Sequence, residues 1–95
     1  MSGHEEALAF RMGGLSDREF RTIVSLARLS SHGDVYARRD TLAKMMNIVE
    51  DDAIFRVQEV CERGLVGPLM LCLAVDPATD ERVMTFVGKF EPQEA

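Results

Sequence analysis

The sequence predicts an α+β fold, in which a set of helices is followed by a C-terminal β-hairpin. Apolar residues recur at helical spacing between about residues 3 and 63, and the period changes to two after Gly64. A serine followed three residues later by a glutamate, the signature of a helix start, occurs twice near the N-terminus. Helices followed by strands in this order are typical of α+β domains. Ninety-five residues make one domain, residues 1–95, with one modest core.

The charge balance of the chain is acidic. The chain is 46% hydrophobic and 28% charged, as a folded globular protein is, and only the tail at residues 91–95 is expected to be flexible. The formal net charge is −5. Modules that bind nucleic acid are usually basic, because contacts with phosphates supply most of their affinity. The total charge therefore disfavours DNA binding, although a local basic patch is sufficient for it.

Cysteine usage and hydropathy bear on where the chain resides. Cys61 and Cys72 are too few for a disulfide framework, and both have apolar neighbours. The N-terminus has no basic stretch followed by a long apolar segment, so no signal peptide is expected. No apolar run approaches the roughly 18 residues that a membrane span requires. We expect a cytoplasmic chain without membrane contact, whose two thiols are reduced and serve as small core residues.

The first two helices have similar start signals. An N-terminal segment of residues 3–13 contains a helix over about residues 3–12, with a capping box at Ser2–Glu5 and two glycines at its end. The second helix begins with the capping box Ser16–Glu19, which Leu15 precedes as a hydrophobic staple. Its apolar spacing continues to about residue 30, where the turn sequence SSHGD follows.

A short strand and two further helices are predicted between residues 35 and 64. A short β-prone piece at residues 35–37 leads into a helix over about residues 39–46. Asn47 ends that helix, because asparagine tolerates the left-handed conformation. A third core helix spans about residues 50–63 and stops at Gly64. Its inward stripe is Ala53, Ile54, Val57, Val60 and Cys61.

The third core helix begins with three carboxylates, Glu50, Asp51 and Asp52. Carboxylates in a first turn interact favourably with the helix dipole, by about 0.3–1 kcal/mol each. Val49 occupies the position that a Ser or Thr cap usually takes, so one of the carboxylates is a candidate cap in its place. The simplest interpretation is that the three residues only stabilise the helix start.

Residues 67–90 are predicted to form the hairpin, with its turn at residues 76–80. Both faces of both strands are apolar, whereas a sheet covered on one side alternates apolar with polar residues. Another element is therefore expected to cover the outer face of the hairpin. The N-terminal helix is the nearest candidate. The alternatives are a second copy, which gives a homodimer through this outer face, and another protein.

The order helix, short strand, helix, tight turn, helix and hairpin resembles the winged helix-turn-helix fold. LAKMMNI resembles the first helix and turn of the motif, and ERGLV resembles the end of its third helix. GLSDREFRTIVSLARLSSHGDV is similar to the first helix of domains in phage and plasmid replication or regulatory proteins. The resemblance covers about residues 14–90. It implies a three-helix core over residues 14–66, a wing over residues 67–90, and a small regulator that binds double-stranded DNA in replication or transcription.

The resemblance also implies which residues contact DNA. The first helix of the motif crosses the DNA backbone in this fold, which implies phosphate contacts for Arg38, Arg39 and Lys44, and Arg56 of the third helix joins them. Gln58 is the only good base-reading residue on the outward face of the third helix.

The charges favour a different hypothesis, in which the chain is an adaptor or inhibitor that docks on a basic protein. Carboxylates on the outward face of the third helix repel phosphates. Phe55 lies among them, and an apolar anchor ringed by polar residues is typical of a protein interface. An acidic helix of this kind can stand in for a phosphate backbone. The candidate partner-binding residues are Glu50, Asp51, Phe55, Glu59 and Glu62.

The sequence contains no catalytic or cofactor motif. His4 and His32 have no metal-ligand spacing with the cysteines, and the chain has no phosphate-binding glycine loop. No local pattern joins serine, histidine and aspartate, and a core of this size leaves little room for a deep pocket. We therefore expect no enzymatic activity, no catalytic residues, no cofactor and no metal.

Overall fold

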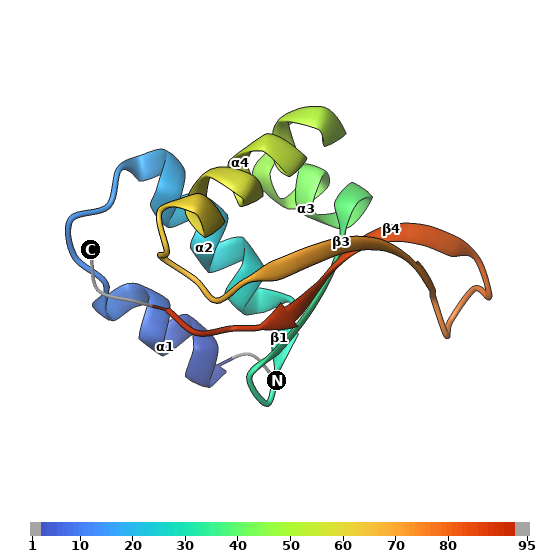
Figure 1. The fold of residues 1–95 in the computed structure, drawn as a ribbon, viewed down its shortest axis with the longest axis horizontal. Coiled ribbons are helices and arrows are strands. Elements are labelled where there is room, and N and C mark those ends of the chain that lie inside the picture. The colour runs from blue at the N-terminus through green and yellow to red at the C-terminus, as the bar shows by residue number, and fades with distance from the viewer. Residues whose placement is uncertain (1–2, 93–95) are drawn as a thin grey trace.

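The computed structural model describes residues 3–92, which form four α-helices and four β-strands (Figure 1). Ser2, the predicted cap of the first helix, and residues 93–95 of the predicted tail lie outside the described residues. The described part has the predicted α+β class, with helices before the hairpin. In chain order the elements are α1 (Gly3–Arg11), α2 (Asp17–Arg28), β1 (Ser30–Ser31), β2 (Asp34–Arg38), α3 (Arg39–Met46), α4 (Glu50–Glu62), β3 (Leu69–Val75) and β4 (Arg82–Lys89).

The capping box predicted for α2 is confirmed. Ser16 Oγ accepts a hydrogen bond from the Glu19 N–H at 3.1 Å, and the Ser16 N–H donates to Glu19 Oε1 at 3.0 Å. These bonds satisfy backbone donors that a helix start leaves free. Further along α2, the side chains of Ile23 and Leu26 are fully buried, and α1, α3 and α4 all pack against this helix.

The turn between α3 and α4 forms at Asn47, as the sequence predicts. Asn47 has left-handed backbone angles, φ 55° and ψ 48°, and its N–H donates to the Lys44 carbonyl at 3.2 Å. Val49 is then the N-cap of α4, but no side chain among the described residues caps this helix. The predicted cap by a carboxylate is therefore wrong. One physical reason is that Glu50, the first of the three carboxylates, pairs with Arg39 instead.

The four strands form one antiparallel sheet in the order β1-β2-β4-β3. The register places Ala37 of β2 and Leu71 of β3 on either side of Phe86 in β4. Residues directly opposite one another point to the same face, so these three side chains share the helix-facing side. Ala37 and Phe86 are buried there. The distal part of the β3–β4 hairpin extends beyond the helices (Figure 1), and Leu73 on the same face is exposed there.

The N-terminal helix does not cover the outer face of the hairpin, so this prediction is wrong. α1 packs mainly against α2, and Met70 on the outer face of β3 is 66% exposed. The contacts between α1 and α2 include the rings of Phe10 and Phe20, which lie 5.4 Å apart, and an ion pair in which Arg28 Nε lies 2.8 Å from Glu6 Oε1. The short link between the two helices favours this local pairing over a more distant position across the sheet.

The chain itself covers part of the outer face. Tyr36 Oη donates to the Val75 carbonyl at 3.0 Å, and Arg38 bonds the carboxylate of Asp76. Both side chains thus join β2 to the far end of the hairpin. Thr85, which the register places beside Arg38 on this face, is fully buried. The apolar outer face is therefore partly closed by contacts within one chain.

Candidate interaction surface

The outward side of α4 is acidic and has an aromatic ring at its centre. Five of the thirteen residues of α4 are carboxylates, and one is basic. The prediction that Phe55 points outward is confirmed, because 56% of this residue is exposed, whereas Val57 and Val60 are buried on the opposite side. We call the acidic α4 surface the set of exposed and half-exposed residues Glu50, Asp51, Asp52, Phe55, Gln58, Glu59 and Glu62.

Arg18 of α2 holds the centre of the acidic α4 surface in place. Its guanidinium lies 5.5 Å from the centroid of the Phe55 ring, within the range of a cation–π interaction. The same guanidinium bonds both carboxylate oxygens of Glu59, at 3.1 and 3.4 Å. One arginine thus restrains two side chains that are a helical turn apart. A restrained ring loses less conformational entropy when it enters a partner's pocket.

Arg38, the first predicted phosphate contact, is bound by carboxylates of its own chain. Its Nε and Nη2 contact the two Asp40 oxygens at 3.0 and 2.7 Å, and Nη1 contacts Asp76. Hydrogen bonds to Asp40 first, and then to Asp76, raise the pKa of Arg38. The same guanidinium holds the pKa of Asp40 below its ordinary value. The charge of Arg38 is therefore neutralised within the fold.

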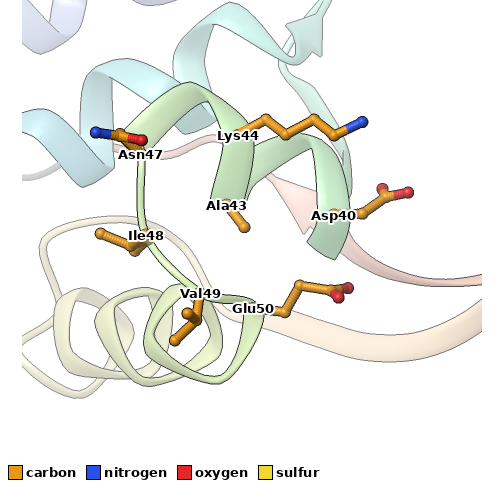
Figure 2. A pocket seen from close by; sticks show the side chains of 7 residues that line it. All are labelled: Asp40, Ala43, Lys44, Asn47, Ile48, Val49 and Glu50. Atoms are coloured by element: carbon orange, nitrogen blue, oxygen red, sulfur yellow. The ribbon is translucent and has the colours of Figure 1, made fainter.

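Arg39 and Lys44 also lie among carboxylates. Arg39 Nε contacts Glu50 Oε1 at 3.0 Å. Lys44 is exposed and forms no ion pair with any described residue, and it lines an open hollow of about 590 Å³ beside the α3–α4 turn. Figure 2 shows that Asp40, Lys44 and Glu50 point toward the same side of this turn. Lys44, which is unpaired among the described residues, thus has two carboxylates beside it. The apolar lining is Ala43, Ile48 and Val49.

Arg56 lies in a different hollow, at the start of α2, which it lines with Asp17, Arg18 and Arg21. Its Nε is buried and has no hydrogen-bond partner among the described residues. Gln58, the predicted base-reading residue, is exposed on α4 among carboxylates. The four predicted phosphate contacts therefore do not form one continuous basic patch in the described part of the chain.

Sequence reasoning missed the residues that bind these arginines. Asp40 follows Arg38 by two positions, so its proximity is visible in the sequence. Asp76 is 38 positions from Arg38, and Arg18 is 41 positions from Glu59. These long-range pairs depend on how the hairpin bends and on how α2 crosses α4, which no local pattern shows.

Both cysteines are free and only partly buried, and Cys61, one of the two expected core residues, packs against the hydrophobic core. Burial nevertheless raises the pKa of the Cys61 thiol, which makes it a poor nucleophile. Among residues 3–92, no three His, Cys, Asp or Glu side chains are placed to hold a metal ion. None of the helices in this range is long and apolar enough to cross a bilayer.

A scan against models of known protein families found no match for this chain, and searches of curated proteins and of solved structures found no similar protein. The functional inference therefore depends on the side chains described above.

Proposed function

We propose that residues 14–90 form a winged helix-turn-helix domain, in which α3 and α4 are the two helices of the motif and the β3–β4 hairpin is the wing. Three features support this assignment. Asn47 makes a tight left-handed turn between α3 and α4, the hairpin follows α4 directly, and β2, which precedes α3, pairs with the hairpin strand β4.

We infer that this domain docks on a protein with a basic surface, as an adaptor or inhibitor, through the acidic α4 surface. The observation that carries this inference is the half-exposed ring of Phe55, restrained by Arg18 and surrounded by carboxylates. In such an interface a buried aromatic anchor supplies most of the affinity. The surrounding charges set the rate of association and the choice of partner. Among the described residues, Asp51, Asp52 and Glu62 form no ion pair, so their charges are available to a partner's lysines and arginines.

DNA binding in replication or transcription is the second candidate function. The helix–turn–helix arrangement of α3 and α4 and the exposed Lys44 and Gln58 favour it. The ion pairs of Arg38 and Arg39 oppose it, because a phosphate has to displace a carboxylate at each. The carboxylates of α4 add repulsion that counterion release does not offset.

Binding to DNA is tested by titrating the chain with random duplex DNA at about 50 mM salt, where phosphate contacts are strongest. We expect no salt-sensitive binding in the micromolar range. The same titration is repeated with the double variant Arg38→Ala, Arg39→Ala. If the chain binds DNA in the micromolar range, and if added salt and the double variant weaken this binding, the function is DNA binding and not protein docking.

Protein docking is tested with a photo-reactive amino acid in place of Phe55, followed by purification of the cross-linked protein and measurement of its affinity. We expect Phe55→Ala to weaken this affinity about 30-fold, which corresponds to a hot-spot loss of about 2 kcal/mol. Phe10→Ala is the matched control, because Phe10 of α1 is 61% exposed and, like Phe55, contacts a side chain of α2. Equal affinities of the Phe55→Ala and wild-type chains would refute docking through this ring.

A further inference from the structure

The outer edge of β3 is an uncharged and unpaired strand edge. β3 is a terminal strand in the sheet order, and among residues 3–92 only β4 pairs with it. Its seven residues, LMLCLAV, include no charged residue and no proline. Folded proteins usually protect such edges with lysine, proline or a bulge, because an open row of N–H and C=O groups recruits another strand. The β3–β4 register continues from Leu69 to Val75 without a bulge.

The hydrogen-bond pattern shows which groups of β3 are available. The Asp76 N–H donates to the Glu81 carbonyl at 2.8 Å, and the ladder continues from this pair. Backbone groups along an antiparallel strand point alternately toward and away from its partner. The N–H and C=O groups that point away from β4 therefore belong to Leu69, Leu71, Leu73 and Val75.

Two of these four residues already have partners within the chain. The Val75 carbonyl accepts from Tyr36 Oη, and the backbone of Leu69 hydrogen-bonds the Cys61 thiol. The backbone groups of Leu71 and Leu73 remain, and Leu73 is also 63% exposed. These two residues flank Cys72, so the available part of the edge is symmetric about that residue.

We propose that β3 pairs with β3 of a second copy of this chain, antiparallel, about a two-fold axis that passes at Cys72. Leu71 of each copy then lies opposite Leu73 of the other. In each of these pairs, the N–H of either residue donates a hydrogen bond to the C=O of the other. An isologous contact of this kind requires one self-complementary surface, and the symmetric edge provides it. Two β4–β3 hairpins thereby join into one continuous sheet.

The charges around β3 also fit a second copy. The net charge of −5 makes two copies repel at most surfaces, but β3 brings no charged residue to the contact. The proposed register places Asp76 of one copy in line with Pro68 and Lys89 of the other. Asp76 and Lys89 then lie on the same outer face, about 9.5 Å apart between Cα atoms, which corresponds to two strand spacings. Each is already paired within its own chain, Asp76 with Arg38 and Lys89 with Asp34, so neither brings an uncompensated charge to the contact.

The contact is one strand wide, which is small for a specific interface. We therefore expect a reversible dimer whose fraction rises with protein concentration. Sedimentation equilibrium from about 10 μM to about 1 mM measures this fraction. A chain that remains monomeric over this range overturns the proposal.

Disulfide trapping tests the register. Cys72 faces its own copy across a pair without backbone hydrogen bonds, where Cα atoms lie about 4.5 Å apart, within the range that a disulfide spans. Under mild oxidation we expect the Cys61→Ser variant to form a cross-linked dimer as fast as the wild type. The Cys72→Ser variant should form none. Cross-linking that depends on Cys61 instead overturns the register.

A backbone substitution tests the edge itself. Leu73→Pro removes an N–H that β4 does not use, so the hairpin tolerates it, whereas Leu73→Ala keeps this N–H. We expect the proline variant to lose the dimer and the alanine variant to retain it. Circular dichroism shows whether the proline variant folds. If it does not fold, the cross-linking of the cysteine variants tests the proposal instead. If the dimer survives Leu73→Pro, the edge of β3 does not form it, and the proposal is overturned. The proposal is also overturned if Met70→Lys abolishes the dimer, because Met70 lies on the outer face and not at the edge.

Discussion

The guanidinium of Arg38 bonds the carboxylate of Asp76 and so joins the end of β2 to the turn of the β3–β4 hairpin. Arg38 is also the N-cap residue of α3, the helix that leads into the turn at Asn47. The β3–β4 hairpin and α3 are thereby connected through one ion pair. A hairpin held in this way is restricted in its movement relative to α3, and the arginine that was expected to bind phosphate has a structural role.

Asp76→Asn is expected to release the end of the hairpin, because it removes the charge that Arg38 binds. Tyr36 donates to the neighbouring Val75 carbonyl, and it is the only tyrosine of a chain without tryptophan. Its fluorescence therefore reports on this contact. We expect acrylamide to quench tyrosine fluorescence more strongly in Asp76→Asn than in the wild type. Asp80→Asn, in the same turn but without a side-chain hydrogen bond or ion pair among the described residues, should leave quenching unchanged. Equal quenching in all three chains would show that the bond between Arg38 and Asp76 does not hold the end of the hairpin in place.

Leu42→Ala and Phe55→Ala should differ sharply in their effect on stability. Leu42 is fully buried in the core, and truncation of such a residue costs about 2–5 kcal/mol of unfolding free energy. Phe55 is half exposed, and its contact with Arg18 contributes about 0.5–1 kcal/mol. Urea unfolding measures both changes. A loss at Phe55 as large as that at Leu42 would mean that the ring belongs to the core and is not an interaction residue.

Local signals predicted much of the fold. The capping box of α2 joins residues three positions apart, and the left-handed turn at Asn47 needs only one residue of a suitable type. The change of hydrophobic period after Gly64 located the hairpin. Such features depend on interactions within a few residues, so the sequence pattern contains the information that they need.

The position of α1 and the strand β1 were not predictable in the same way. Both α2 and the outer face of the hairpin offer apolar surface to α1. In the structure α1 packs on α2, with Phe10 against Phe20. Ser30 and Ser31 have turn chemistry, yet they pair with β2 across the turn at His32 and Gly33. Tertiary context overrides weak strand propensity at such positions.

The candidate site was predictable in its outline and not in its electrostatics. Helical spacing alone placed Phe55 outward and Val57 inward, and both positions are confirmed. The neutralisation of Arg38 by Asp76 required the bend of the hairpin. A list of basic residues in the sequence therefore overstates the positive charge that the folded chain offers to DNA.

Val49→Ser is expected to stabilise the chain. Val49 is the N-cap of α4, is 66% exposed, and makes no side-chain capping bond. A serine hydroxyl at this position accepts from a first-turn N–H, which is worth about 0.5–2 kcal/mol relative to a residue that cannot cap. Thermal unfolding gives the stability of Val49→Ser and of the control Val49→Ala. The difference between the two variants is the effect of the serine cap, because both lack the valine side chain. A serine variant no more stable than the alanine variant would show that the start of α4 is satisfied in another way.

Glu19 should make the stability of the fold depend on pH under acidic conditions. The hydrogen bond from Arg63, and then the bond from the Ser16 backbone, hold the pKa of this carboxyl below its ordinary value of 4.5. As the pH falls, Glu19 of the unfolded chain takes up a proton before Glu19 of the folded chain does. The stability that it contributes is therefore complete above pH 4.5 and is lost progressively below it.

Glu19→Gln isolates this contribution, because glutamine keeps the oxygen that caps α2 but has no charge. Urea unfolding between about pH 7 and pH 3 gives the free energy of unfolding at each pH. We expect a smaller decrease below pH 4.5 in Glu19→Gln than in the wild type, although Asp40, whose pKa Arg38 also lowers, maintains part of the slope. Glu62→Gln is the control, since Glu62 is exposed and forms no ion pair with the described residues. If Glu19→Gln and Glu62→Gln lost stability equally with falling pH, the contact between Glu19 and Arg63 would have no net effect on folding.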